Sequence, residues 1–270
     1  MIRRYTVSDL QTRKGLGFYQ APHFEAGDSL IHAFTSRQGG VSPPPFHALN
    51  LGTGTGDQET HVKSNREILM RTFGLDPSVL FTANQVHEAD ILILESSTPA
   101  EVSKVSRDAI ITQRRGIAIG VLTADCVPIL VFDPVHRAVA AIHAGWKGIA
   151  GDLVGKTIRT MVDQFETRPE KLRAAVGPSI GPRCYEVDDQ VRSAFSHHPD
   201  GWSKWAEAVS SRAWMFNLSQ ASVDLLLGSG VRPDNLVFLD VCTHCHPHLF
   251  YSHRRDNGRT GRQISFVMLK

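Results

Sequence analysis

The chain has 270 residues, of which 41% are hydrophobic and 21% charged, a composition typical of a soluble globular protein. The formal net charge of +2 is too small to favour nucleic acid or a membrane surface, and nothing in the composition points to a protein partner. The most apolar stretch is interrupted by Asp125 and is too short to cross a membrane. The N-terminus lacks the apolar run of a secretory signal, and the 4 cysteines form no disulfide pattern, so we expect a cytoplasmic protein.

The first part of the chain predicts strands, a long loop and a helix. Residues 29–36 (SLIHAFTS) have the alternation of a strand, and residues 37–58 are dense in Gly, Pro, Ser and Thr. Residues 59–75 carry apolar positions at helical spacing, which Gly74 and Pro77 end. Two further strands are predicted at residues 79–87 and 90–96.

The rest of the chain alternates strands and helices with no linker or internal repeat. Several strands are continuous apolar runs, which are typical of strands buried on both faces. We therefore expect one α/β domain over residues 1–270. Strands are predicted at residues 108–113, 117–125, 128–134, 138–145, 235–243 and 264–270, and residues 172–182 are predicted as a strand that runs into a Gly/Pro loop. Helices are predicted at residues 148–166, 187–196 and 217–231.

Two of these apolar runs place a thiol and an imidazole at the same end of a predicted hairpin. The first apolar run begins just after Cys126, and the second ends just before His143, with a turn at residues 133–137 (DPVHR) between them. An antiparallel hairpin closed at that turn brings Cys126 and His143 side by side.

A third candidate for the same site is His87, at the end of another predicted strand. Two imidazoles and a thiolate suit zinc, with a fourth position left for water or substrate. A Cys126 thiolate activated by His143 would instead form a metal-free hydrolase dyad. The spacing does not separate these two chemistries.

Some polar residues are candidates for binding phosphate or ribose. Arg37 lies in the polar loop, and Lys147 stands at the start of a predicted helix, where free N–H groups favour an anion. Asn50 either braces the loop or contacts the substrate. Residues 242–248 (CTHCHPH) look like a metal-binding tract, but the spacing alone does not supply four well-placed ligands, and we expect no stoichiometric metal there.

The chain resembles the multicopper polyphenol oxidase (laccase-like) family, whose members are also called peptidoglycan editing factors or purine nucleoside phosphorylases. The similarity extends from about Ile31 to Met268. It rests on an ordered set of motifs: RQGGVSPPPFHALNLG, NQVH, VLTADCVPILVFDP, AIHAGWKG, AVGPSIGPRCYEV and YSHRRDNGRTGRQ.

The resemblance implies a four-layer α/β/β/α fold with mixed sheets and one zinc per chain, held by His87, Cys126 and His143. It implies phosphorolysis of purine nucleosides (adenosine, inosine, guanosine or methylthioadenosine), with deamination of adenosine as a companion activity and oxidation of phenols with Cu²⁺. Nucleoside and phosphate are then the small-molecule partners. It also makes Arg254 a candidate for binding phosphate or substrate.

The chain departs from the family pattern in three places. Glu88 replaces the usual Gly after QVH, Lys147 stands where Arg is common, and residues 242–256 are unusually rich in His and Cys. The paired histidine arrays of a multicopper oxidase are missing, so we expect only weak, copper-dependent phenol oxidation. The alternatives are a Cys–His hydrolase or amidase acting on a cell-wall precursor, and a zinc-stabilised binding protein without turnover.

Overall fold

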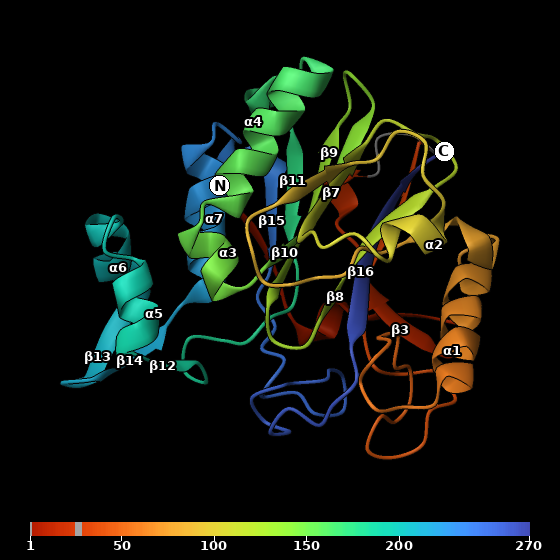
Figure 1. Cartoon of the computed structure of the whole chain (residues 1–270), viewed down its shortest axis with the longest axis horizontal. Coiled ribbons are helices and arrows are strands. Elements are labelled where there is room, and N and C mark those ends of the chain that lie inside the picture. The colour runs from red at the N-terminus through yellow and green to blue at the C-terminus, as the bar shows by residue number, and fades with distance from the viewer. Residues whose placement is uncertain (1, 25–28) are drawn as a thin grey trace.

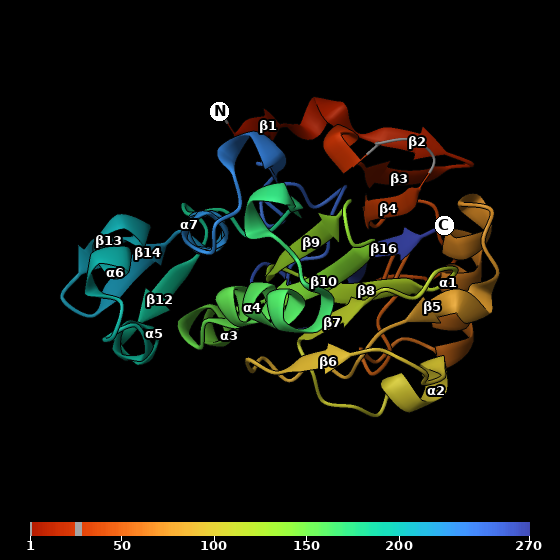
Figure 2. The ribbon, with the colours of Figure 1, turned by 90° about the horizontal axis from the view of Figure 1, so that it is seen from above.

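Two mixed β-sheets packed face to face form the centre of the computed structural model, which describes residues 2–24 and 29–270 (Figures 1 and 2). The first has the strand order β1-β15-β11-β9-β10-β7-β6, and the second has the order β2-β3-β4-β16-β8-β5. The seven strands of the first sheet are β1 (Arg3–Tyr5), β6 (Ile91–Ile93), β7 (Ala109–Thr112), β9 (Val127–Asp133), β10 (Ala138–Ala144), β11 (Arg173–Val176) and β15 (Leu236–Leu239). The six strands of the second are β2 (Gln11–Arg13), β3 (Leu16–Tyr19), β4 (Leu30–Thr35), β5 (Leu80–Phe81), β8 (Ala118–Thr123) and β16 (Gln263–Leu269).

Helices cover the outer faces of both sheets, on opposite sides of the molecule (Figure 1). One buried apolar cluster joins α3, α4 and α7 to the seven-stranded sheet, a second fills the space between the sheets, and a third joins α1 to the six-stranded sheet. The expected α/β fold with mixed sheets in one domain is therefore confirmed. The helices are α1 (Glu59–Thr72), α2 (Pro99–Val102), α3 (Trp146–Ala150), α4 (Leu153–Phe165), α5 (Asp189–Ala194), α6 (Pro199–Trp205) and α7 (Leu218–Gly228).

A small sheet that the sequence patterns did not predict lies beside these layers. Its strands are β12 (Glu186–Asp188), β13 (Ala206–Ser210) and β14 (Ala213–Phe216), and α5 and α6 pack with it (Figure 1). Short 3₁₀ helices at Val7–Asp9, Pro22–Phe24, Pro77–Val79, Pro169–Lys171 and Pro233–Asn235 complete the regular structure. No helix in the described part of the chain is long and apolar enough to span a membrane.

The predicted hairpin is present as β9 and β10. These strands pair antiparallel from Asp133 with Ala138 to Val127 with Ala144, and every residue of both strands is buried. Their continuous apolar sequence follows from their central place in the sheet, where both faces are covered.

Three predicted elements differ from the structure. The helix expected over residues 187–196 is shortened to α5, because residues 186–188 pair with β14 as strand β12. The single helix expected over residues 148–166 is divided into α3 and α4, because Asp152 adopts a left-handed conformation with φ of 58°. The strand expected over residues 79–87 is reduced to β5, so that His87 lies in a loop, also with a positive φ of 62°. This loop conformation turns His87 out of the sheet.

Candidate metal centre and its cavity

His87, Cys126 and His143 meet at the open end of the β9–β10 hairpin. His143 lies in β10, Cys126 directly precedes β9, and His87 comes from the loop after β5. The potential ligand atoms of the three side chains all lie within 4.8 Å of one another. The two imidazole rings meet edge to face, with their centroids 4.7 Å apart. Residues from three separate segments therefore form one cluster.

A glycine makes this close approach possible. A Cβ atom on Gly145 would lie 3.2 Å from Cys126 Sγ and 3.2 Å from His87 Cδ2, which is tighter than ordinary van der Waals contact. The glycine of the AIHAGWKG motif thus leaves space for the thiol and one of the imidazoles.

The buried carboxylate of Asp108 organises the cluster from behind. His143 Nδ1 donates a hydrogen bond to Asp108 Oδ1 at 2.7 Å, and the same carboxylate accepts the backbone N–H groups of Val86, His87 and Glu88 at 3.2, 3.0 and 2.8 Å. An ionised carboxylate only accepts hydrogen bonds, so Nδ1 carries the proton and Nε2 is left as the ligand atom. Asp108 therefore fixes both the His143 tautomer and the loop that holds His87.

The pKa values of the thiol and the imidazole favour a charged pair. Burial raises the pKa of Cys126. The adjacent His143 charge and the hydrogen bonds from His143 and His87 have a larger, opposite effect, so that the pKa falls to about 6. Burial lowers the pKa of His143, but the Cys126 thiolate and Asp108 together raise it to about 9. In the metal-free protein at neutral pH, Cys126 is thus a thiolate facing a His143 imidazolium.

The donor set fits a metal ion such as zinc. A thiolate and two imidazoles are borderline-to-soft ligands, and the hydrogen bond from His143 Nδ1 to Asp108 is the outer contact that metal-binding histidines generally make. Three protein ligands leave one position of a tetrahedral ion for another molecule. The chemistry of the cluster is therefore that of an open metal site.

This open side faces a large cavity. The three cluster residues line a cavity of about 920 Å³, within the usual size of a small-molecule site. Its lining combines apolar and aromatic side chains, including Leu122, Trp146, Ile180 and Tyr185, with the basic side chains of Arg66, His253, Arg254 and Arg262.

Two guanidinium groups in the cavity wall, those of Arg66 and Arg262, bond to carbonyl oxygens, and the charges of Cys126 and Asp125 partly offset the effect of burial on the pKa of Arg262. Arg66 donates to the carbonyl oxygen of Leu51 at 2.9 Å, and Arg262 donates to the carbonyl oxygens of Thr260 and Gly261. Among the residues that the structure describes, no carboxylate forms an ion pair with either side chain. Burial lowers the pKa of both groups, because a buried cation lacks the solvation of water. An anion in the cavity would compensate for this loss.

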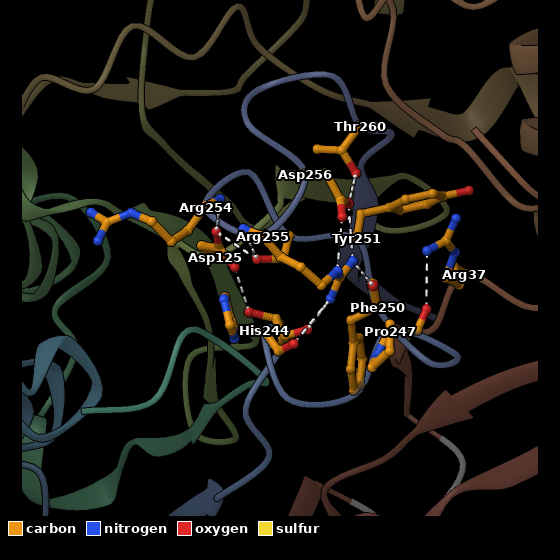
Figure 3. A network of polar contacts seen from close by, with 12 residues as sticks. Arg37, Asp125, His244, Pro247, Phe250, Tyr251, Arg254, Arg255, Asp256 and Thr260 are labelled. Carbon is orange, nitrogen blue, oxygen red and sulfur yellow. Dashed lines mark hydrogen bonds and ion pairs between the residues drawn. The ribbon is translucent and has the colours of Figure 1, made fainter. Parts of the chain in front are cut away.

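Asp125 connects the cluster to the loop that carries Arg254. Its carboxylate accepts hydrogen bonds from Thr243 Oγ1 at 2.7 Å, Ser252 Oγ at 3.0 Å and the Arg254 backbone N–H at 2.7 Å (Figure 3). Asp125 has a positive φ of 98° and immediately precedes Cys126. The network therefore fixes the backbone next to the thiol and places Arg254 at the cavity.

Of the residues predicted to bind phosphate or substrate, Arg254 lines the cavity, whereas Arg37, Asn50 and Lys147 are not among its described lining residues. The Arg254 guanidinium lies over the Tyr185 ring. Arg37 donates to the carbonyl oxygens of His47 and Pro247 and lies over the Tyr251 ring (Figure 3). The Asn50 side chain donates to Thr55 and Asp57, and it also accepts the N–H groups of Gly52 and Arg262, which brace the loop. Lys147 is exposed and lies near the Trp146 ring.

Asp108, Arg66 and Arg262 are site residues that the sequence reasoning did not select. Asp108 stands at the start of the apolar run DAIITQ, and an acidic residue next to a buried strand is a usable signal. Arg66 lies in α1, and Arg262 directly precedes β16. Their sequence positions look like those of surface arginines, so only the fold reveals that they line the cavity.

The chain belongs to the multi-copper polyphenol oxidoreductase laccase family, whose model matches residues 31–270. Purine nucleoside phosphorylase YlmD of Bacillus subtilis is 32% identical over 250 residues, which cover 89% of each chain. Purine nucleoside phosphorylase ORF3 of Streptomyces griseus is 36% identical over 247 residues, 89% of this chain and 95% of the relative. The crystal structure of Bacillus licheniformis hypothetical protein YfiH superimposes with a TM-score of 0.90 at 30% identity, covering 97% of this chain and 99% of that one.

Proposed function

We propose that this protein is a zinc-dependent purine nucleoside phosphorylase. The observation that carries the proposal is the meeting of an open thiolate–imidazole cluster and several arginines in one cavity. The arginines suit phosphate and the cavity volume suits a nucleoside. Relatives named purine nucleoside phosphorylase support the choice of reaction.

In the proposed reaction, a phosphate oxygen attacks C1′ of the nucleoside. The bond from C1′ to the purine nitrogen breaks, its electron pair leaves with the purine, and ribose 1-phosphate forms. Arg254, Arg262 and Arg66 bind the phosphate through charge-assisted hydrogen bonds, which must replace its hydration. Trp146 and Tyr185 give the purine an aromatic surface. Zinc held by His87, Cys126 and His143 supplies Lewis-acid charge at the cavity wall.

The finer assignments are also proposals. Adenosine, inosine, guanosine and methylthioadenosine are the candidate nucleosides, and adenosine deamination is a companion activity. Phenol oxidation is weak and follows added Cu²⁺. A cytoplasmic location is supported by the four cysteines, all of which are free thiols. Arg37, Lys147 and Asn50 remain sequence-based predictions as substrate ligands, since each makes other contacts.

A metal-free thiol hydrolase or amidase acting on a peptidoglycan precursor is the second candidate. The arrangement of Cys126, His143 and Asp108 favours it, because a thiolate, an imidazole and an orienting carboxylate are the parts of such a site. A binding protein without turnover fits less well, since a structural zinc is usually closed by a fourth protein ligand.

Release of ribose 1-phosphate from adenosine and inosine, measured with and without phosphate, tests the proposal. We expect cleavage only when phosphate is present, and we expect chelation of the metal to abolish it. Cleavage at the same rate in phosphate-free buffer would identify a hydrolase. Activity that survives complete removal of the metal would favour the thiol mechanism.

A further inference from the structure

A second group of cysteines and a histidine lies where the loop after β11 meets the loop after β15. Cys184 Sγ and Cys245 Sγ are 3.3 Å apart. Together with a ring nitrogen of His244, their potential ligand atoms all lie within 4.8 Å of one another. None of these three residues is among the described residues that line the cavity, so the group is separate from the centre at His87.

Cys242 lies next to this group and is the candidate for a fourth ligand. Its thiol interacts with that of Cys184, and its Sγ accepts the backbone N–H of Gly181 at 3.1 Å. A Cβ on Gly181 would lie 3.2 Å from both Cβ and Sγ of Cys242, so the glycine allows the backbone to approach the sulfur. Hydrogen bonds of this kind orient metal-binding thiolates.

The backbone around the group is fixed by contacts that do not involve the thiols. Ser179 and Thr243 join the two loops through an N–H to carbonyl hydrogen bond of 3.0 Å. The Arg255 guanidinium donates to the carbonyl oxygens of Thr243, His244 and Phe250 and pairs with Asp256 (Figure 3). The backbone that carries the candidate ligands is therefore held in place by hydrogen bonds and an ion pair.

We propose that Cys184, Cys242, His244 and Cys245 bind one Zn²⁺ in a closed, structural site. Three thiolates and one imidazole form a common ligand set for tetrahedral structural zinc. Binding releases the three thiol protons to the solvent and changes no oxidation state. The chain then holds two zinc ions, one more than the sequence predicts.

This second zinc would order one wall of the cavity. Tyr185 directly follows Cys184, and Arg254 lies on the same loop as the other ligands. The Arg254 guanidinium donates to the carbonyl oxygen of Glu186 at 2.9 Å and lies over the Tyr185 ring. A metal that joins the two loops would therefore hold together the side chains of Arg254 and Tyr185.

The test is the zinc content of the full-length protein, purified with a reductant, loaded with Zn²⁺ and dialysed. We expect two zinc ions per chain in the wild type and one in Cys184→Ser, Cys245→Ser and Cys126→Ser. The double variant Cys126→Ser/Cys184→Ser should hold none. His246→Ala is the matched control, because this histidine lies on the same loop but outside the group, and it should retain two.

Cobalt spectroscopy gives a second measurement that does not depend on the cluster variants folding. Cys126→Ser loaded with Co²⁺ should show tetrahedral bands and strong thiolate-to-cobalt charge transfer from the remaining site. A Cys126→Ser protein without thiolate bands would overturn the proposal. A reduced wild type that binds a single zinc, unaffected by Cys184→Ser, or that retains a Cys184–Cys245 disulfide, would overturn it as well.

Discussion

The two cysteine–histidine groups of this chain differ in composition, burial and surroundings. The group at His87 has one thiol and two imidazoles, is supported by the buried Asp108 and faces the cavity. The group at Cys184 joins the thiols of Cys184 and Cys245 with the imidazole of His244, has Cys242 as its proposed fourth ligand, and lies outside the cavity lining.

From this difference we expect a reactive site at the first group and a structural one at the second. Three ligands leave a position for substrate, whereas four ligands of mostly sulfur close the coordination sphere. The carboxylate behind His143 tunes its tautomer and charge, while the second group is supported mainly by backbone hydrogen bonds. Chemistry is therefore expected at the first group and loop stability at the second.

The largest effect should follow loss of a ligand at the open site. We expect Cys126→Ser and His143→Ala to reduce kcat/KM for phosphorolysis by about 1000-fold or more, because about 4 kcal/mol of electrostatic stabilisation is lost. Cys245→Ser should mainly lower the melting temperature and change kcat/KM much less. Steady-state kinetics and thermal melts of the same preparations measure both. If Cys245→Ser lowered kcat/KM as much as Cys126→Ser, the assignment of a reactive and a structural group would be wrong.

The arginines of the cavity give the next effect. Arg254→Ala and Arg262→Ala should reduce phosphate-dependent cleavage by about 30- to 1000-fold, equivalent to about 2 to 4 kcal/mol for a lost charged partner. The dependence of rate on phosphate concentration measures this, with zinc content unchanged. Lys156→Ala, which removes an exposed charge on α4, is the control.

Arg37→Ala and Lys147→Ala, measured in the same way, compare the sequence-based and structure-based assignments. The sequence predicts a loss of similar size in both variants. If phosphate saturation changes in these two and not in Arg254→Ala or Arg262→Ala, the cavity arginines are not the phosphate site.

Asp108→Asn should reduce zinc affinity at the open site by about 10- to 100-fold, as outer contacts of metal ligands typically do. The amide cannot hold the His143 Nδ1 proton as a carboxylate does. Competition with a chelating dye measures the affinity. Asp133→Asn is a matched control, because Asp133 makes a similar contact with His136 at 2.9 Å far from either group. The same affinity loss in both variants would mean a general effect on folding.

The pH dependence of thiol reactivity tests the charged pair. The pKa of Cys126 is about 6 in the metal-free protein, so the thiolate persists above that pH and is protonated as the pH falls through it. Alkylation by iodoacetamide should be half-maximal near pH 6 and fall about tenfold per unit below it. In His143→Ala, the midpoint should move upward because the facing cation is gone. A midpoint at the ordinary thiol pKa in the wild type would contradict the pairing.

The smallest effect is expected at the two glycines that touch the groups. Gly145→Ala and Gly181→Ala each place a Cβ 3.2 Å from a cysteine sulfur, and crowding of this kind costs about 1–3 kcal/mol. Gly145→Ala should act on activity, and Gly181→Ala on melting temperature. Gly228→Ala, with nothing within 4 Å of the added atom, is the control for both.

The open site was largely predictable because its ligands lie at the ends of apolar strands. Cys126 and His143 flank the hairpin, and their meeting follows from strand pairing alone. His87 was selected, but its loop conformation was missed, since the short apolar run there does not reveal where the strand ends. Asp152 interrupts the predicted helix because it adopts a left-handed conformation, and the spacing of apolar residues does not predict such a break.

The rest of both sites depends on contacts between distant segments. Arg66 and Arg262 come from different ends of the chain, and only the fold brings them to one cavity. Cys184 was not selected in the sequence analysis, and the spacing within residues 242–248 alone did not supply four well-placed ligands. The pairing of the two loops brings Cys184 to this tract.

Titration of the metal-free protein with Zn²⁺, followed by the rate of ribose 1-phosphate formation in phosphate buffer, tests the central claim most directly. We predict no cleavage without zinc, and a rate that rises until the open site is filled and remains absent in Cys126→Ser at every zinc concentration. Full cleavage by the zinc-free wild type, or by Cys126→Ser, would contradict a zinc-dependent phosphorylase at this site.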